Sequence, residues 1–305
     1  MGRAFAMKCA AALMVGAAAT GCGAAAVGPS GNSASPRPKA RELTDAEQIL
    51  IQRAEQTLVK KCVEEAGFKY WIGRLPTVDE LKGTGYVLTD VDWAKRNGYG
   101  TRLQEKLQTI QRSDPNNTYA RSLSQEERVR YSTALEGGPS SGMLTVELPG
   151  GGTVQTPRDS CQVEAKRKLY GDFETWFQTE KTATNLSRVY VPVLLKDQRF
   201  VDAVEKWSAC MREADHDYAS PQEIRKRLPE VTKGMGRDEA FAQEVKLAVA
   251  EARCATRTPL SETALALQNE YRAKQPQQYR DAVVTYQHMS LAALQRAEDI
   301  VGSSD

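Results

Sequence analysis

Two aspartates close to a tryptophan are the residues for which acid–base chemistry is hardest to exclude in this sequence. Asp90 and Asp92 are separated by one residue, and Trp93 follows them directly. A pair of carboxylates can hydrolyse glycosidic bonds, with one acid and one base or nucleophile. The competing interpretation is structural, because Asp is a favoured N-cap residue and Asp90 can begin a short helix. A cell-wall hydrolase that uses these carboxylates is therefore kept as the alternative function.

A second pattern spells the nucleophile motif of many hydrolases. Residues 138–142 read Gly-x-Ser-x-Gly, but that motif requires a strand before the serine and a helix after it. Here a helical pattern precedes the motif and a strand-like pattern follows it. The two histidines are poor candidate bases, since His216 lies between two aspartates after a helix end and His288 lies late in the last helical segment. We expect a loop at 138–142, no catalytic residue there and no cofactor.

The cysteines carry a clearer chemical signal. The chain has six, and four of them fall in the part of the sequence with folded character. No two have C-x₂-C spacing and only two histidines are present, so a zinc site is disfavoured, although a site of four cysteines stays open. In an exported protein, four such cysteines favour two disulfides.

An internal repeat selects one of the three pairings that four cysteines allow. Residues 62–70 and 210–218 each begin with a cysteine at the end of an amphipathic helix, continue through Glu-Ala and reach a tyrosine eight positions on. We therefore expect two related halves with one bridge each. The predicted bridges are Cys62–Cys161 and Cys210–Cys254.

The first 21 residues have the order of a signal peptide. Arg3 and Lys8 form a positive start, and an apolar stretch of about 13 residues follows at 9–21. This stretch is too short to span a bilayer and is typical of a signal sequence. It ends in small residues before Cys22, which resembles the lipobox of bacterial lipoproteins. The resemblance implies diacylglycerol on Cys22 and an anchor at the outer face of the plasma membrane.

The segment after the lipobox has the composition of a tether. Residues 23–41 are rich in Gly, Ala, Ser and Pro, and such a segment has an r.m.s. reach of about 25 Å. Two or more acyl chains, such as palmitate, anchor a protein stably where one does not. We expect a lipidated flexible tether at 22–41. The alternative is an ordinary secreted protein cleaved after Ala26, since Ala19 stands where a lipobox usually has Leu.

The charge of the chain disfavours nucleic acid as a partner. Two of its 41 basic residues, Arg3 and Lys8, lie in the predicted signal peptide, so its 39 acidic residues balance the rest from Cys22 onward. Nucleic-acid binders usually carry a strong basic excess. We expect no nucleic-acid partner.

Helical periodicity dominates the remaining sequence. Helix starts are predicted at five places: Thr44 with Glu47, Ser124 with Glu127, Ser220 with Pro221 and Glu223, Thr156 with Pro157, and Thr258 with Pro259. In the first helix one face is apolar, which directs Cys62 toward the core. That face consists of Leu50, Ala54, Leu58, Cys62 and Ala66. Residues 143–147 and 153–155 alone have strand character and flank a glycine-rich turn, which predicts a hairpin.

These elements define the expected organisation. The fold class is mostly α, with two related helical halves that each hold one disulfide and a small β-hairpin in the first. The first half spans 42–196 and the second 197–305. Because the two predicted bridges differ in loop length, the first half should contain an insertion, at 72–157.

The insertion is enriched in aromatic residues on irregular backbone. Such residues often form recognition surfaces for sugars, peptides or proteins. The competing interpretation is that they cap the helical core. The candidate binding residues are Trp71, which directly precedes the insertion, and Tyr86, Trp93, Tyr99 and Tyr119 within it.

Several short motifs together resemble a family of uncharacterised actinobacterial lipoproteins. They are Asn97-Gly98-Tyr99-Gly100, Asp114-Pro115-Asn116, Asp159-Ser160-Cys161 and Trp207-Ser208-Ala209-Cys210-Met211. The resemblance covers about residue 47 to the C-terminus and implies a helical lipoprotein, with no catalytic or binding residues to carry over. We expect a non-enzymatic binding or scaffold protein, anchored to the membrane through the lipid on Cys22. Its partner would be a cell-wall polymer or an envelope protein.

Overall fold

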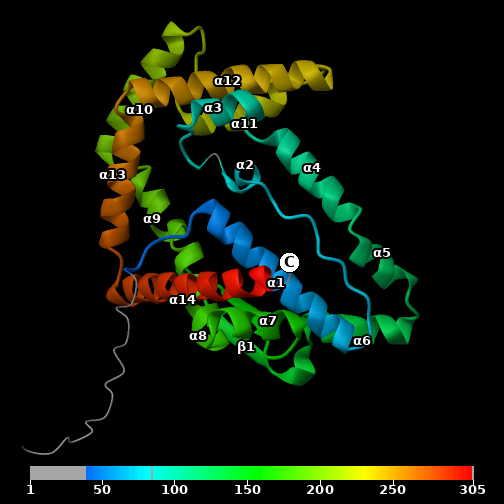
Figure 1. Cartoon of the computed structure of the whole chain (residues 1–305). Helices are drawn as coiled ribbons and strands as arrows, with labels where there is room; N and C mark the ends of the chain where they lie inside the picture. The colour runs from blue at the N-terminus through cyan, green and yellow to red at the C-terminus, as the bar shows by residue number, and fades with distance from the viewer. Residues whose placement is uncertain (1–38, 84, 304–305) are drawn as a thin grey trace, which may run out of the picture. The chain divides into compact units, whose positions relative to one another are not determined.

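The computed structural model describes residues 39–83 and 85–303 (Figure 1). The predicted signal peptide, the predicted lipidation site Cys22 and most of the predicted tether lie outside the described residues. The helices are α1 (Asp45–Glu65), α2 (Val78–Leu81), α3 (Val91–Asn97), α4 (Thr101–Arg112), α5 (Pro115–Ser122), α6 (Gln125–Glu136), α7 (Cys161–Tyr170), α8 (Phe173–Asn185), α9 (Ser187–Leu194), α10 (Gln198–Glu213), α11 (Pro221–Val231), α12 (Arg237–Arg257), α13 (Leu260–Ala273) and α14 (Gln277–Gly302). A short 3₁₀ helix, η1 (Pro139–Ser141), precedes the strands β1 (Met143–Glu147) and β2 (Thr153–Pro157). The expected mostly-α class with one hairpin is confirmed.

Local capping explains where several helices begin. Thr44 Oγ1 accepts the backbone N–H of Glu47 while the Glu47 carboxylate accepts that of Thr44, so α1 starts with the predicted capping box. Ser124 begins α6 in the same way. Ser220 caps α11, with Pro221 at the first helical position. These predictions are confirmed because each depends only on residues within one turn.

Two predicted helix starts are corrected. Thr156 and Pro157 belong to β2, because Thr156 pairs with Leu144 in the hairpin. The following helix, α7, begins at Cys161 instead, and Ser160 Oγ accepts the N–H of its third residue at 3.1 Å.

At the other site a helix does begin next to Pro259, but Thr258 does not cap it. The Thr258 hydroxyl donates to Cys254 O at 2.7 Å and so closes the end of α12. The next helix, α13, starts at Leu260 with Pro259 before it and no side-chain cap.

The buried face of α1 differs from the predicted stripe by about one residue. Leu50, Leu58 and Cys62 are half-buried and Ala66 is exposed. The fully buried residues of α1 are Ile51, Ala54, Val59 and Val63. The shift arises because α1 packs against several helices: Ile51 and Ala54 cluster with residues of α7 and α14, and Val59 and Val63 cluster with residues of α6 and α7.

Helices from the two sequence halves pack against each other. The C-terminal helix α14 lies along α1, α7 and α8, and α3, from the predicted insertion, packs on α12 (Figure 1). Ile51 and Leu169 meet Ala293 and Ala297 in one cluster. All described residues fall within one compact unit, Pro38–Asp305. The division at 196/197 therefore remains a prediction from sequence.

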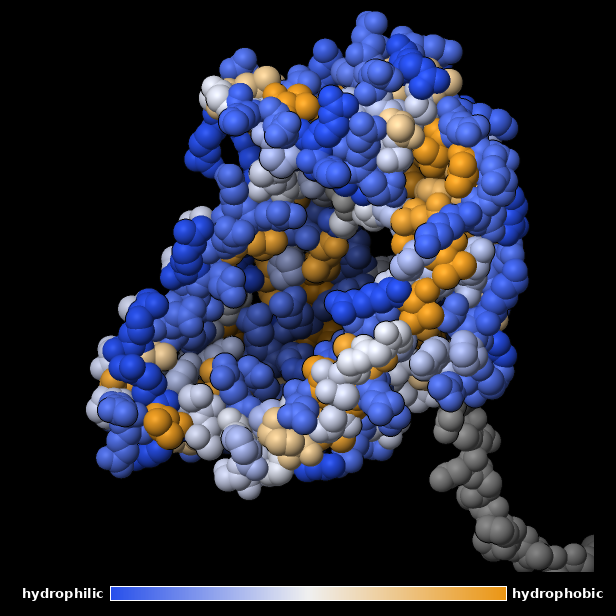
Figure 2. All heavy atoms as spheres, turned by 180° about the vertical axis from the view of Figure 1, so that it is seen from behind, coloured by the Kyte–Doolittle hydropathy of each residue, from blue (hydrophilic) through white to orange (hydrophobic). Residues whose placement is uncertain are grey.

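The face of the molecule in Figure 2 is largely hydrophilic, with hydrophobic side chains in smaller areas between polar ones. The largest buried cluster centres on Trp207, which is fully buried with Met211 and Leu260. Among the described residues, no helix is both long and apolar enough to span a membrane.

Candidate functional site

Both predicted disulfides are present. Cys62–Cys161 joins α1 to α7 with a Cα–Cα distance of 5.5 Å. Cys210–Cys254 joins α10 to α12 with a Cα–Cα distance of 5.7 Å. Each bridge closes a long loop of 99 or 44 residues between packed helices, so both constrain the unfolded chain strongly.

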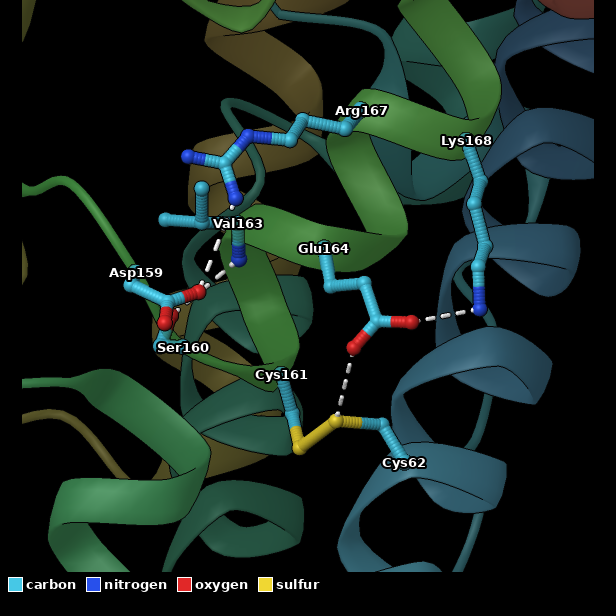
Figure 3. The surroundings of a disulfide bond; sticks show 8 residues. All are labelled: Cys62, Asp159, Ser160, Cys161, Val163, Glu164, Arg167 and Lys168. Carbon is cyan, nitrogen blue, oxygen red and sulfur yellow. Dashed lines mark hydrogen bonds and ion pairs between the residues drawn. A yellow bond between two sulfur atoms is a disulfide. The ribbon is translucent and has the colours of Figure 1, made fainter.

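The surroundings of the first bridge are polar on one side (Figure 3). Glu164 Oε2 lies 3.4 Å from the Cys62 sulfur, and since a bridged sulfur carries no proton this is a contact rather than a hydrogen bond. Lys168 Nζ holds the same carboxylate at 2.6 Å. Cys161 itself is 4% exposed. A thiolate that approaches the Cys62 sulfur from this side therefore meets a carboxylate.

Three of the five predicted binding aromatics lie against the helical core. Trp93 is 2% exposed, and its indole N–H donates to Asp79 O at 2.9 Å. The hydroxyl of half-buried Tyr86 donates to Ala264 O at 3.1 Å. The Tyr99 hydroxyl donates to Glu251 Oε2 at 2.8 Å. The hydroxyls of Tyr86 and Tyr99 thus fix the inserted segment on α13 and α12, and the Trp93 indole joins α3 to α2 within that segment.

The other two aromatics form a separate pair. The rings of Trp71 and Tyr119 meet edge to face with centroids 5.6 Å apart, and Tyr119 continues to Tyr131 in the same geometry at 5.7 Å. Asn116 bonds the backbone of Trp71 through both amide atoms. Trp71 is 41% exposed. The structure thus joins only this pair at a surface and places the other three elsewhere.

Two buried glutamates of α12 hold the inserted segment, and sequence reasoning missed them. Glu244 Oε1 accepts the N–H groups of Tyr99 at 2.7 Å and Thr101 at 3.1 Å. It is 4% exposed. Gly98 permits this approach, because a Cβ there would lie 2.7 Å from Glu244 Cγ and its φ is +60°.

The second glutamate is more deeply placed. Glu251 is fully buried, and its Oε1 accepts the N–H of Leu88 at 3.0 Å and a guanidinium N–H of Arg225 at 2.7 Å. Burial raises the pKa of Glu251, and the Arg225 charge with the Leu88 and Tyr99 donors opposes that rise. A signal was available in the sequence, since Glu244 and Glu251 are seven residues apart and share the face of Leu247 and Ala248. That spacing places acids on an apolar helix face.

The aspartates considered for catalysis have structural partners. Asp90 caps α3, where its Oδ1 accepts the N–H of Trp93 at 2.8 Å, and its other oxygen lies 3.0 Å from Lys82 Nζ. The Trp93 N–H and then Lys82 lower the pKa of Asp90. Asp92 is paired with Lys95 at 2.8 Å, and this bond lowers its pKa too. Neither carboxyl has the raised pKa that suits a general acid.

The Gly-x-Ser-x-Gly segment lies between a helix and a strand, in the order its context predicts, and the expected loop contains one short helical turn. Residues 139–141 form the 3₁₀ helix η1, which leads into β1. The serine of the motif, Ser140, lies in η1, and the neighbouring Ser141 donates its hydroxyl to Gly138 O at 2.8 Å. His216 follows α10 and His288 lies within α14, on separate elements from Ser140.

A groove of about 760 Å³ runs between β1, α8 and the start of α14. One side consists of the consecutive residues 144–148, and the other carries Thr175, Gln178 and Thr182 of α8. Its carboxylates are Glu147, Asp172 and Glu174, and no lysine or arginine lines it. Its volume lies in the range of ligand-binding clefts.

A second groove of about 830 Å³ lies between α4 and the start of α12. It is lined by Arg74, Lys106 and the two ion pairs Arg102–Asp238 and Arg237–Glu105. Because its charged groups are paired with one another across the groove, fewer of them are free to bind a ligand than in the groove beside β1. Within the described residues, no group of three or more His, Cys, Asp or Glu side chains is arranged to hold a metal ion.

Comparison with known proteins supplies no relative. No family model, curated protein or solved structure matches this chain. The actinobacterial lipoprotein resemblance therefore remains a prediction from the motifs.

Proposed function

We propose that this chain is an exported lipoprotein that holds a binding partner at the outer face of the plasma membrane. The observation that carries the proposal is the pair of disulfides, each joining two packed helices. Disulfides persist in oxidising compartments and are rare in the cytosol. The signal-like residues 1–21 and the lipobox-like Cys22 are consistent with export.

The bridges suit a domain that must keep its shape outside the cell. They fix α1 on α7 and α10 on α12, while the glutamates of α12 hold the inserted segment in place. The tether at 22–41 would let this domain move within about 25 Å of its anchor. The partner would be an envelope protein or a cell-wall polymer, bound on a rigid surface of the domain.

The geometry gives the hydrolase alternative less support. Glycoside hydrolysis needs one carboxyl that is protonated near neutral pH. The pKa of Asp90 is lowered by the Trp93 N–H and Lys82, and the pKa of Asp92 is lowered by Lys95. Both are therefore ionised at neutral pH.

The anchor is tested by Cys22→Ser in the full-length chain expressed in its bacterial source, with Cys9→Ala as the matched control in the apolar signal stretch. We expect Cys22→Ser to move the protein from the membrane fraction to the medium or to block its maturation. Cys9→Ala should leave it in the membrane fraction. A Cys22→Ser protein that is processed normally and stays membrane-bound would refute the anchor.

A further inference from the structure

The hairpin has a free edge whose hydrogen-bonding groups are defined by the register. Leu148 N–H donates to Gly152 O, and Arg158 N–H donates to Gly142 O. In an antiparallel ladder every second pair is hydrogen-bonded, so the even-numbered residues of β1 face β2. The backbone N–H and C=O groups of Met143, Thr145 and Glu147 therefore point away from β2. No other described backbone group bonds to them.

The groove beside β1 lies along this free edge. Its lining takes every residue from 144 to 148, from both faces of the strand, and no residue of β2. A cavity over one face of a strand would touch alternate residues only. The opposite wall is α8, which packs against β1 (Figure 1). The groove thus has a strand edge on one side and a helix on the other.

This arrangement matches a recognised way of binding extended peptides. A peptide can add a strand to an exposed sheet edge, where backbone bonds give affinity and flanking side chains give specificity. The five residues of β1 correspond to about 17 Å of extended chain. Leu144 and Val146 remain packed in one cluster with Val163 of α7 and Phe173 and Phe177 of α8, so the edge is held rigid for such a strand.

Charge indicates what kind of peptide fits. Of the lining carboxylates, Glu174 pairs with Arg158 and Asp172 caps α8. Glu147 is exposed and forms no ion pair within the described chain. Because no basic side chain lines the groove, a peptide with Lys or Arg near Glu147 is favoured. A second copy of this chain would bring two acidic grooves together and is disfavoured.

We propose that the β1 edge binds an extended, lysine- or arginine-bearing segment of a partner polypeptide as a third strand of the hairpin. The proposal rests on the proposed function only in placing that partner outside the cell. It assigns a binding role to residues 143–148 and to the wall of α8, rather than to the aromatic residues of the insertion.

Two proline variants form a matched test, because proline removes a backbone N–H. Thr145→Pro removes a donor that faces the groove. Gln155→Pro removes the equivalent donor on the outer edge of β2, since Gln155 pairs with Thr145. Both variants lose the same Gln155–Thr145 side-chain bond and leave the β1–β2 ladder bonds in place, and edge strands tolerate proline.

The probe is an acetylated, amidated hexapeptide of alternating lysine and valine, titrated by calorimetry into the chain from residue 23 onward. We expect Thr145→Pro to weaken its Kd about tenfold or more. Gln155→Pro should change it less than twofold, and the same peptide with glutamate in place of lysine should bind at least tenfold more weakly. Equal loss in both proline variants, no preference for lysine, or no binding to the unaltered chain would overturn the proposal.

Amide hydrogen exchange on the unaltered chain gives a second measurement that needs no variant. Saturating peptide should slow exchange at Met143, Thr145 and Glu147, whose N–H groups are free in the hairpin, and leave Thr153 and Gln155 unchanged. Slowing that appears without peptide and grows with protein concentration would assign the edge to a second copy and overturn the proposal. Because this chain carries no lipid, the result is independent of the test at Cys22.

Discussion

Glu251 offers the sharpest test of how the inserted segment is held. Replacing it with alanine removes the acceptor for the Leu88 N–H, the Tyr99 hydroxyl and the Arg225 guanidinium together. Glu251 is fully buried and the Arg225 side chain is 23% exposed. Removing one partner of such a pair costs about 3–5 kcal/mol, because the other charge stays buried without compensation.

The expected loss of stability is large relative to the total stability of a domain. A domain of ordinary stability unfolds with about 5–15 kcal/mol, so Glu251→Ala should remove a substantial part of it. Glu251→Gln keeps an acceptor oxygen and the side-chain shape but not the charge. It should cost less, about 1.5–3 kcal/mol, the range for a hydrogen bond to a charged group.

Urea unfolding of the oxidised protein, followed by far-UV circular dichroism, measures both variants. Glu239→Ala is the matched control, since Glu239 is an exposed glutamate at the start of the same helix and should change stability by less than about 0.5 kcal/mol. If Glu251→Ala costs no more than Glu239→Ala, the buried bonds do not stabilise the insertion and the reasoning is refuted.

Three further outcomes follow from local geometry. Burial alone would raise the pKa of Glu80, but its bonds to Arg74, Thr77 and Lys106 outweigh burial and lower that pKa from 4.5 to about 2. The ionised Glu80 carboxylate therefore stabilises the fold by at most about 3 kcal/mol. This stabilisation should be complete above pH 5 and lost as pH falls toward 2. When the free energy of unfolding is measured against pH, Glu80→Gln should reduce this acid-dependent loss. A loss as steep as in the unaltered protein would contradict the role of Glu80. Gly137→Ala should lower the free energy of unfolding in urea by more than about 2 kcal/mol, because a Cβ there would lie 2.4 Å from Asp159 O at a φ of +82°. Gly138→Ala is the control and should be nearly neutral. Similar costs for the two variants would count against the geometry. Replacing both Cys210 and Cys254 with alanine should lower the free energy of unfolding in urea by up to about 4 kcal/mol for the 44-residue loop. An unchanged free energy of unfolding would show that the bridge constrains little.

Features encoded within a few residues could be predicted from sequence. The capping boxes at Thr44 and Ser124 need only a side chain and a backbone group three residues apart. The hairpin follows from alternating residues beside a glycine-rich turn. The disulfide pairing follows from the repeat around Cys62 and Cys210. The two segments are similar in local sequence, and this similarity indicates which distant cysteines pair.

Features that depend on distant contacts could not be predicted in the same way. The bond from Tyr99 to Glu251 joins residues 152 positions apart, and neither helix periodicity nor composition specifies that α3 packs on α12. The types of the aromatic residues in the insertion suit recognition and so favour a binding surface, yet Trp93 is buried by that packing. The sequence does not predict the groove at β1, because the binding groups on that edge are backbone N–H and C=O groups, which leave no mark in a sequence.

The most direct test of the proposed function is intact mass spectrometry of the native protein taken from the membrane fraction of its source. The proposal predicts a chain that begins at Cys22, carries diacylglycerol or further acyl chains on that residue and has the mass of two intact disulfides. Peptide mapping without reduction should then recover Cys62 joined to Cys161 and Cys210 joined to Cys254. A chain without lipid at Cys22, or one with four free thiols, would contradict the proposal.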